Sequence, residues 1–351
     1  MMLQGHFIDT LLAIEYRDPD NIAYSTWLYF RGITAPVFFT ISGLIFTYLL
    51  IKAKEKGTLS MRIRKGLVRG LMLIGIGYAL RIPIFRWLTG KFGTYFMVID
   101  VLQCIGLSLI LIVCIYLLAR KKTLMFSVVM LCLGTLIFLC EPLYRTYSAE
   151  GIPLFFANYL TKVNGSVFTI LPWFGYMAYG AFIATLFYGY LTRPKFKTGL
   201  ITGFFVTGLV LVYGSTPVFL ELAKLTNWTL LTEVANFNYL FIRLGNVLVI
   251  FGLFYAFEAY LKQPVVLKIG QKTLSIYVIH FILLYGSFTG LGLNQILGKN
   301  LTPFEAIFGA ICFLISVSLI SIYIIKANTQ IYKYIIDKLH YLKSLTKSLN
   351  N

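Results

Sequence analysis

The chain has 351 residues, of which 58% are hydrophobic and only 13% are charged, and its formal net charge is +18. Soluble domains carry about 25% charged residues, so this composition excludes an ordinary soluble protein and indicates a polytopic membrane protein. In a membrane protein, the positive charge indicates cytoplasmic loops that set the topology and contact anionic lipid. We therefore expect membrane lipid, and no nucleic acid, as a partner.

Ten apolar segments follow one another along the chain, and most have the roughly 20 residues that a membrane-spanning helix needs. We predict an all-α fold, a polytopic membrane helical bundle of about ten transmembrane helices. The five cysteines fall inside these segments without metal-ligand spacing, so we expect no disulfide and no metal site. The predicted spans are 1–14, 31–52, 67–88, 96–119, 123–141, 167–190, 198–217, 238–260, 269–290 and 303–326.

The first segment, "MMLQGHFIDTLLAI", is too short to cross a bilayer. At ~1.5 Å per residue it covers about 21 Å, whereas the hydrocarbon core is ~30 Å thick. It has no basic start and no small-residue cleavage site, so it does not resemble a cleaved signal peptide. We expect a first helix that is truncated at its start, within a transmembrane acyltransferase-sized domain at 1–326.

Lysine and arginine are concentrated in alternate connections between the segments. The stretch from Lys52 to Arg69 contains seven of them, and "ARKKT", "LTRPKFK" and "LKQPVVLK" follow the fourth, sixth and eighth segments. By the positive-inside rule, both termini are predicted to be cytoplasmic. Residues 327–351 carry apolar residues near helical spacing with lysines between them, which predicts a basic amphipathic tail or, alternatively, a frayed end.

Polar side chains lie inside several spans, where an ionised group costs at least ~2.5–3.5 kcal/mol at mid-depth. In the predicted orientation they fall in the outer halves of the helices, which indicates one polar cavity that opens outward. Alternatively, Arg31 and Arg86 extend to the interface, Arg243 pairs with Asp100 as a structural bridge, and His280 is a satisfied core histidine. The candidate substrate-binding residues are Arg31, Arg81, Asp100, Gln103, Trp173, Arg243 and His280.

His6 differs from these residues because an acidic residue, Asp9, follows it by three positions on the same helix face. A carboxylate beside an imidazole orients the ring and raises its basicity. We predict that His6 is a catalytic base, and that Asp9 orients it and stabilises the imidazolium that forms.

Four stretches, "MMLQGHFIDTLL", "FRGITAPVFFTISGLIF", "DVLQCIGLSL" and "ILPWFGYMAYGA", resemble the transmembrane acyltransferase superfamily in their order and spacing. The nearest branch is the bacterial relatives of heparan-α-glucosaminide N-acetyltransferase, and the acyltransferase-three family is a more distant cousin. "KIGQKTLSIYVIHFILLY" fits as well, so the resemblance covers Met1 to about Tyr285. It matches His6 to the family's catalytic histidine, and Arg31 and Gln103 to family positions.

The resemblance implies transfer of an acyl group, usually acetyl, from cytoplasmic acetyl-CoA to a hydroxyl or amine of an extracytoplasmic sugar or glycan. The setting it implies is the inner membrane of a bacterium. Gln103 or Arg81 would stabilise the oxyanion, and the Lys52–Arg69 loop either meets CoA phosphates or only sets topology. Trp173 either stacks on a sugar or belongs to an interfacial aromatic belt. The acceptor's identity, the acyl length and oligomer formation stay open.

Two other function classes compete with this interpretation. A transporter or flippase for a polar or lipid-linked solute would favour broken helices in matching halves of the chain. Pro36 and Pro83 interrupt two spans, but no matching second half is evident. A non-catalytic membrane scaffold would not need intramembrane histidine, aspartate and arginine on so many helices.

Overall fold

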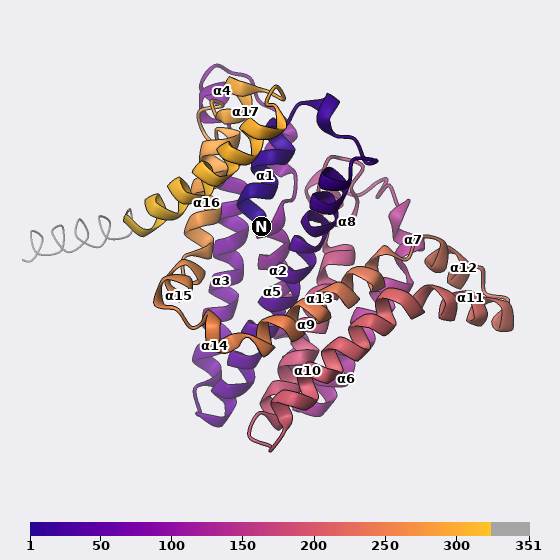
Figure 1. The fold of residues 1–351 in the computed structure, drawn as a ribbon. Helices are drawn as coiled ribbons and strands as arrows, with labels where there is room; N and C mark the ends of the chain where they lie inside the picture. The colour runs from indigo at the N-terminus through magenta and orange to yellow at the C-terminus, as the bar shows by residue number, and fades with distance from the viewer. Residues whose placement is uncertain (324–351) are drawn as a thin grey trace, which may run out of the picture. The chain divides into compact units, whose positions relative to one another are not determined.

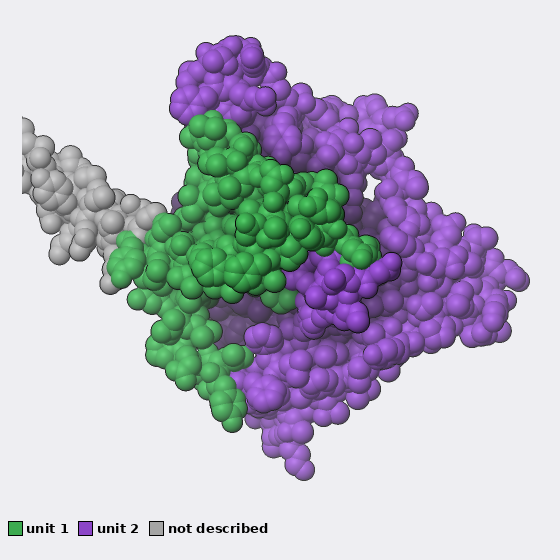
Figure 2. Space-filling model, turned by 45° about the horizontal axis from the view of Figure 1, so that its top comes forward, with its two compact units in different colours: residues 1–19, 259–351 green, residues 20–258 purple. Residues whose placement is uncertain are grey.

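The computed structural model describes residues 1–323, so the predicted tail at 327–351 lies outside the described residues. The regular elements of this described part are helices (Figure 1), apart from one isolated bridge between Leu12 and Leu301. The all-α prediction is therefore confirmed for residues 1–323. The chain forms two compact units, unit 1 with residues 1–19 and 259–351 and unit 2 with residues 20–258 (Figure 2).

The described chain contains six helices that are long and apolar enough to cross a membrane. A seventh span results if α15 (Pro264–Gly270) and α16 (Thr273–Tyr285), which meet at an angle of 65°, are one broken span. These helices confirm the polytopic membrane class. The six are Ile22–Glu55, Thr94–Leu118, Ile170–Tyr190, Phe196–Thr226, Tyr239–Ala256 and Pro303–Tyr323.

Three of the predicted spans correspond to helices outside this set, each for a physical reason. α1 (Met2–Leu11) has only 10 residues, and α6 (Thr123–Leu139) has 17. α3 (Leu59–Ala79) has 21 residues, but its first half carries basic side chains. The number of ten spans and the orientation of the termini therefore stay predictions.

Glycines allow the main helix pairs of unit 2 to approach closely. α2 (Ile22–Glu55) packs along α9 (Ile170–Tyr190), and a Cβ on Gly43 or on Gly180 would overlap a backbone carbonyl oxygen of the other helix. Small residues of this kind are enriched where membrane helices touch backbone to backbone. The same arrangement joins α3 to α5 (Val101–Leu118) at Gly70 and Gly106, and α10 (Phe196–Leu209) to α13 (Tyr239–Ala256) at Gly208 and Gly245.

The Lys- and Arg-rich connections of unit 2 gather at one of its ends. Lys54 Nζ, at the end of α2, donates a hydrogen bond to the Lys121 carbonyl oxygen after α5, at 2.9 Å. The Tyr188 hydroxyl, near the end of α9, donates to Glu55 Oε1 at 2.8 Å. The carboxyl ends of α2, α5 and α9 therefore lie together, as the alternation of basic connections requires.

Unit 1 has an apolar core between α1, α16 and the helix Pro303–Tyr323. The Phe7 ring of α1 packs on Phe313 at a centroid distance of 5.2 Å. Beyond α1, the Ala13 amide donates to the Leu301 carbonyl and the Leu301 amide to the Leu11 carbonyl, both at 3.0 Å. The core residues are Leu3, Phe7, Leu11, Ile276, Leu284, Ala310, Phe313 and Val317.

Shorter helices connect these elements. They are η1 (Ile14–Tyr16), α4 (Ile84–Leu88), η2 (Thr94–Met97), α7 (Glu141–Arg145), α8 (Leu154–Leu160), η3 (Val210–Gly214), α11 (Ser215–Thr226), α12 (Thr229–Asn236), α14 (Glu258–Leu261) and α17 (Leu293–Leu297).

Candidate active site

The imidazole of His6 lies against α16 within unit 1. Its Nδ1 is 3.1 Å from the Tyr285 hydroxyl oxygen. Its ring centroid is 5.3 Å from that of His280, with the two planes tilted by 31°, and 6.2 Å from the Tyr285 ring, which stands edge-on at 82°. Two aromatic side chains of one helix therefore set the position of the His6 ring.

Thr10 extends this contact by one helical turn. Its Oγ1 donates to the Tyr285 hydroxyl oxygen at 3.4 Å, and the side chain is buried. Residues four apart share a helix face, so His6 and Thr10 present one polar strip to Tyr285. We call His6, Thr10, His280 and Tyr285 the histidine cluster.

His280 is fully buried in the middle of α16. Its Nδ1 lies 3.3 Å from the Ile276 carbonyl oxygen one turn earlier, and the Tyr277 ring stands edge-on at 5.0 Å. A carbonyl oxygen only accepts, so a hydrogen bond here puts the proton on Nδ1. These contacts suit a core histidine and a substrate-binding histidine equally, so both interpretations stay open.

Asp9 is partly buried on α1, three residues after His6. Its backbone oxygen accepts a hydrogen bond from Arg17 at 2.8 Å, and the same guanidinium donates to the Leu12 carbonyl at 2.7 Å. Arg17 thus satisfies carbonyl groups at the end of α1, where a cation also meets the negative end of the helix dipole. The action of the Asp9 carboxylate on His6 stays a prediction.

Arg81 and Asp100 form a largely buried ion pair in unit 2. Arg81 lies 2.8 Å from Asp100 Oδ2, and their side chains are 8% and 14% exposed. Asp100 Oδ1 accepts from the Val101 amide, and Gln103 Oε1 accepts from the Asp100 amide at 3.2 Å, which makes a capping box at the start of α5. The partner of Asp100 is therefore Arg81 and not Arg243.

Gln103 is fully buried, and its two polar atoms have different environments. Oε1 takes part in the capping box, whereas Nε2 has no hydrogen-bond partner within residues 1–323. An amide NH₂ group only donates, and buried donors are nearly always paired. Gln103 therefore offers a donor that could meet a negatively charged oxygen.

The two remaining candidate arginines lie near each other in unit 2. Arg31 is exposed on α2, and the next residue, Gly32, approaches α13: a Cβ there would be 3.4 Å from a guanidinium nitrogen of Arg243. Arg243 lies over the Tyr239 ring at 5.2 Å. Arg86, in contrast, is exposed on the short helix α4.

Trp173 belongs to an aromatic group near the start of α9. Its ring centroid lies 5.0 Å from Phe39, 4.8 Å from Phe168 and 5.8 Å from Tyr176. The indole is half-buried, and its Nε1 has no hydrogen-bond partner in the described part of the chain. This packing leaves both predicted roles of Trp173 open.

A second buried carboxyl, Glu141, was not among the candidates. It begins α7 and is 5% exposed, with Arg145 3.6 Å from Oε2 and the Tyr239 hydroxyl donating to Oε1 at 3.5 Å. Burial raises the pKa of the Glu141 carboxyl, against the opposing effects of Arg145 and Tyr239. A glutamate four residues before an arginine, directly after an apolar run, was the signal in "FLCEPLYR".

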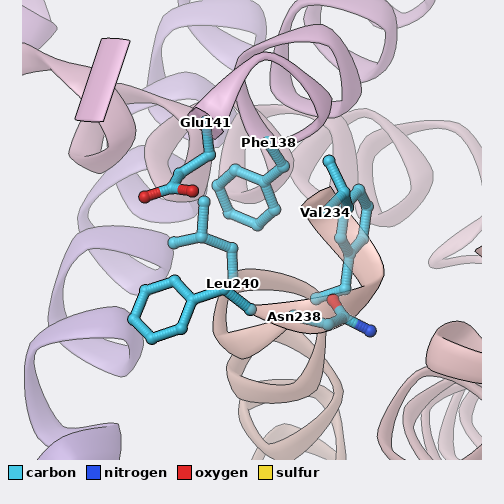
Figure 3. A pocket seen from close by; sticks show the side chains of 7 residues that line it. Phe138, Glu141, Val234, Asn238 and Leu240 are labelled. Carbon is cyan, nitrogen blue, oxygen red and sulfur yellow. The ribbon is translucent and has the colours of Figure 1, made fainter. Parts of the chain in front are cut away.

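Glu141 also borders a cavity of about 170 Å³ (Figure 3). On the same cavity, Asn238 Nδ2 donates to Ser215 Oγ at 2.6 Å and to Thr216 Oγ1 at 3.0 Å, and Asn238 Oδ1 has no partner within residues 1–323. The other walls are apolar, so the cavity joins two acceptor groups to a hydrocarbon lining. The lining residues are Phe138, Glu141, Val234, Phe237, Asn238, Leu240 and Phe241.

The two units divide the predicted site residues. Unit 1 contains His6, Asp9 and His280, whereas unit 2 contains the other six. Sequence analysis missed Tyr285, whose signal was a tyrosine at the end of "HFILLYG". Among residues 1–323 there is no group of three or more His, Cys, Asp or Glu that could hold a metal ion, and the absence of a metal stays a prediction.

Several apolar helices with buried ionisable side chains define this chain as a polytopic membrane protein. Residues 1–221 match the family model described as heparan-alpha-glucosaminide N-acetyltransferase, catalytic. The match covers more than half of the chain, which therefore belongs to this family, and the family makes it a transferase of the membrane acetyltransferase class. Searches of curated proteins and of solved structures found no match.

The family match confirms the resemblance found in the sequence for its main branch. It includes His6 and Asp9 on α1 and the candidates of unit 2 up to Trp173, and it ends before Arg243 and His280. The more distant link to the acyltransferase-three family stays a prediction.

Proposed function

We propose that this chain is a membrane-embedded acyltransferase that moves an acetyl group from cytoplasmic acetyl-CoA to a hydroxyl or amine of an extracytoplasmic sugar or glycan. The setting we propose is the inner membrane of a bacterium, with a domain at 1–326 and a cytoplasmic tail at 327–351. The observation that carries the proposal is the family match over residues 1–221, within which His6 sits in a polar cluster on an apolar helix.

His6 is the proposed general base. As the acceptor's oxygen or nitrogen attacks the thioester carbonyl carbon, its proton moves to the imidazole, which is a suitable base near neutral pH. The carbon–sulfur bond then breaks, and the proton passes from the imidazolium to the departing sulfur. CoA leaves as a thiol and His6 returns to its neutral form. Asp9 is the proposed stabiliser of the imidazolium.

The negative oxygen of the tetrahedral intermediate needs a hydrogen-bond donor. Gln103 and Arg81 are the two proposed donors. The structure favours Gln103, because Arg81 is engaged by Asp100 whereas the Gln103 amide nitrogen has no partner within the described residues. Gln103→Glu, which removes the donor and keeps the length, should reduce turnover without weakening acetyl-CoA binding.

The acceptor is proposed from the family description, which names a glucosaminide. Glucosamine is therefore the first acceptor to test. Trp173 would stack on the sugar ring, a role that its position in an aromatic group supports. Arg31, Asp100, Arg243 and His280 are the remaining proposed contacts to substrate.

The donor side of the proposal rests on charge. The basic connections after α2 and α5 meet at one end of unit 2, through the Lys54–Lys121 hydrogen bond. The positive-inside rule assigns such an end to the cytoplasm, where acetyl-CoA is found. A reporter inserted at Gly57 should act as cytoplasmic and one at Glu150 as external, and the reverse result at both sites would overturn the orientation.

A transporter or flippase is the second candidate. The 65° bend between α15 and α16 favours it, because broken helices commonly line transport sites. The two candidates differ in what they do to acetyl-CoA: an acyltransferase releases the CoA thiol, whereas a transporter does not.

Titration of acetyl-CoA into the purified protein in detergent tests the donor directly. We expect saturable heat of binding that an excess of CoA removes, in the wild type and in His6→Ala alike, because the base is not required to hold the donor. A protein that takes up no acetyl-CoA under these conditions would exclude an acyl-CoA-dependent transferase.

A further inference from the structure

The position of Tyr285 is fixed by the backbone at the end of α16. Gly286, which follows it, has φ of +70°, a conformation that favours glycine. A Cβ on Gly286 would also come within 2.5 Å of the Gly292 amide nitrogen, so the chain turns back tightly. Gln295 of α17 donates to the Tyr285 carbonyl oxygen at 3.4 Å. The hydroxyl of Tyr285 is therefore presented from an anchored residue.

That hydroxyl contacts two residues of one face of α1. Thr10 Oγ1 donates to it at 3.4 Å, and His6 Nδ1 lies 3.1 Å from it. A phenol oxygen has two acceptor sites, so it can receive the Thr10 proton at one and an Nδ1 proton at the other. When Nδ1 of a neutral imidazole carries the proton, the lone pair that can act as a base is on Nε2.

We propose that Tyr285 is a positioning residue that holds His6 with its proton on Nδ1, so that Nε2 is the atom that removes the acceptor's proton. The inference rests on the proposed acyltransferase function and assigns a residue and an atom to its base. Once Nε2 has accepted the proton, the Nδ1–H group still donates to the Tyr285 oxygen. The same hydrogen bond thus holds the ring in both protonation states.

This role is the one that sequence analysis gave to Asp9, and the two partners differ in their chemistry. A carboxylate is negatively charged and would stabilise the imidazolium strongly, whereas a phenol is neutral and mainly fixes orientation and tautomer. The His280 ring, 5.3 Å from His6, adds a second contact from the same helix. Tyr285 therefore acts on the geometry of the base more than on its affinity for protons.

Tyr285→Phe tests the proposal, because it removes the hydroxyl and keeps the ring that packs on Phe281. Steady-state CoA release with glucosamine should show kcat reduced about 3- to 10-fold, the effect of one lost hydrogen bond, with KM for acetyl-CoA unchanged. The matched control is Tyr213→Phe, which removes the hydroxyl of an exposed tyrosine in unit 2 and should change neither constant.

Nitrogen NMR of the histidine-labelled protein gives a readout that does not depend on turnover. The His6 signals, identified by their loss in His6→Ala, should report a proton on Nδ1 in the wild type and a shift toward the Nε2–H tautomer in Tyr285→Phe. An unchanged tautomer in Tyr285→Phe, or an unchanged kcat, would overturn the positioning role. Wild-type protein that shows the tautomer shift but releases no CoA would instead overturn the proposed function.

Discussion

The histidine cluster of unit 1 and the Arg81–Asp100 pair of unit 2 bury polar groups in different ways. Both oxygens of Asp100 are bonded, one to Arg81 and one to the Val101 amide, so the carboxylate caps α5 and neutralises a buried cation. The groups around His6 are a phenol, a hydroxyl and a second imidazole, which carry no required charge. A paired charge of the first kind stabilises a fold, whereas a neutral imidazole can take up and release a proton.

His6→Ala should show the largest effect on activity. Removal of a general base typically costs ~10²–10⁴ in rate, so CoA release with glucosamine should fall by that factor. The melting temperature in detergent should hardly change, because no ion pair is broken. If His6→Ala keeps its turnover and His280→Ala loses it, the base is on α16 and the comparison between the two regions has to be redrawn.

Asp100→Asn should show the largest effect on stability. Asparagine caps a helix about as well as aspartate, so the change isolates the ion pair with Arg81. A buried cation that loses its partner costs about 3–5 kcal/mol, which should appear as a lower midpoint of thermal unfolding. Glu221→Gln, which breaks the exposed pair with Lys224, is the control and should leave the midpoint in place. Equal midpoints in the two variants would refute a stabilising role for the buried pair.

Glu141→Gln should change the pH dependence of stability. Burial raises the pKa of Glu141 above its ordinary value of 4.5, so the folded protein binds a proton that the unfolded chain has released. Stability from this group is present below pH 4.5 and is lost as the pH rises through the raised pKa. Arg145, Tyr239 and Lys162 are the titratable groups that act on it.

The wild-type melting temperature should therefore fall more steeply above pH 4.5 than that of Glu141→Gln, in which residue 141 is always neutral. Parallel melting curves for the two proteins across this range would show that Glu141 keeps an ordinary pKa.

Thr10→Val should have the smallest effect. It preserves the shape of the side chain but removes the donor to the Tyr285 hydroxyl, which is one contact away from His6. We expect a loss of turnover of at most about threefold, at the low end for one hydrogen bond. Thr34→Val on α2 is the comparison, since its hydroxyl donates only to a backbone carbonyl. A larger loss in Thr10→Val than in Tyr285→Phe would mean that Thr10 acts on His6 by another route.

The sequence was most informative where the signal is local. Apolar segments of about 20 residues predicted the long helices, and the order of four short stretches predicted the family. The capping box at Asp100 was also readable, because an aspartate three residues before a glutamine opens an apolar run. Lysine and arginine counts predicted which connections share an end of unit 2, in agreement with the Lys54–Lys121 contact.

Partners far apart in sequence could not be predicted. His6 and Tyr285 are 279 residues apart, and a tyrosine at the end of an apolar run is equally typical of an interfacial aromatic belt. The pairing of Asp100 with Arg81, and not with Arg243, depends on the turn that ends α3. Tertiary packing sets both contacts, and hydrophobic periodicity carries no information about them.

The fate of a labelled acetyl group tests the central claim most directly. Purified wild-type protein would be incubated with acetyl-CoA labelled in its acetyl carbon and with glucosamine, and both the free thiol and the labelled sugar would be measured over time. The account predicts one molecule of acetylated glucosamine for each CoA released. Acetyl-CoA that stays intact, or that is hydrolysed to acetate with no label in the sugar, would contradict it.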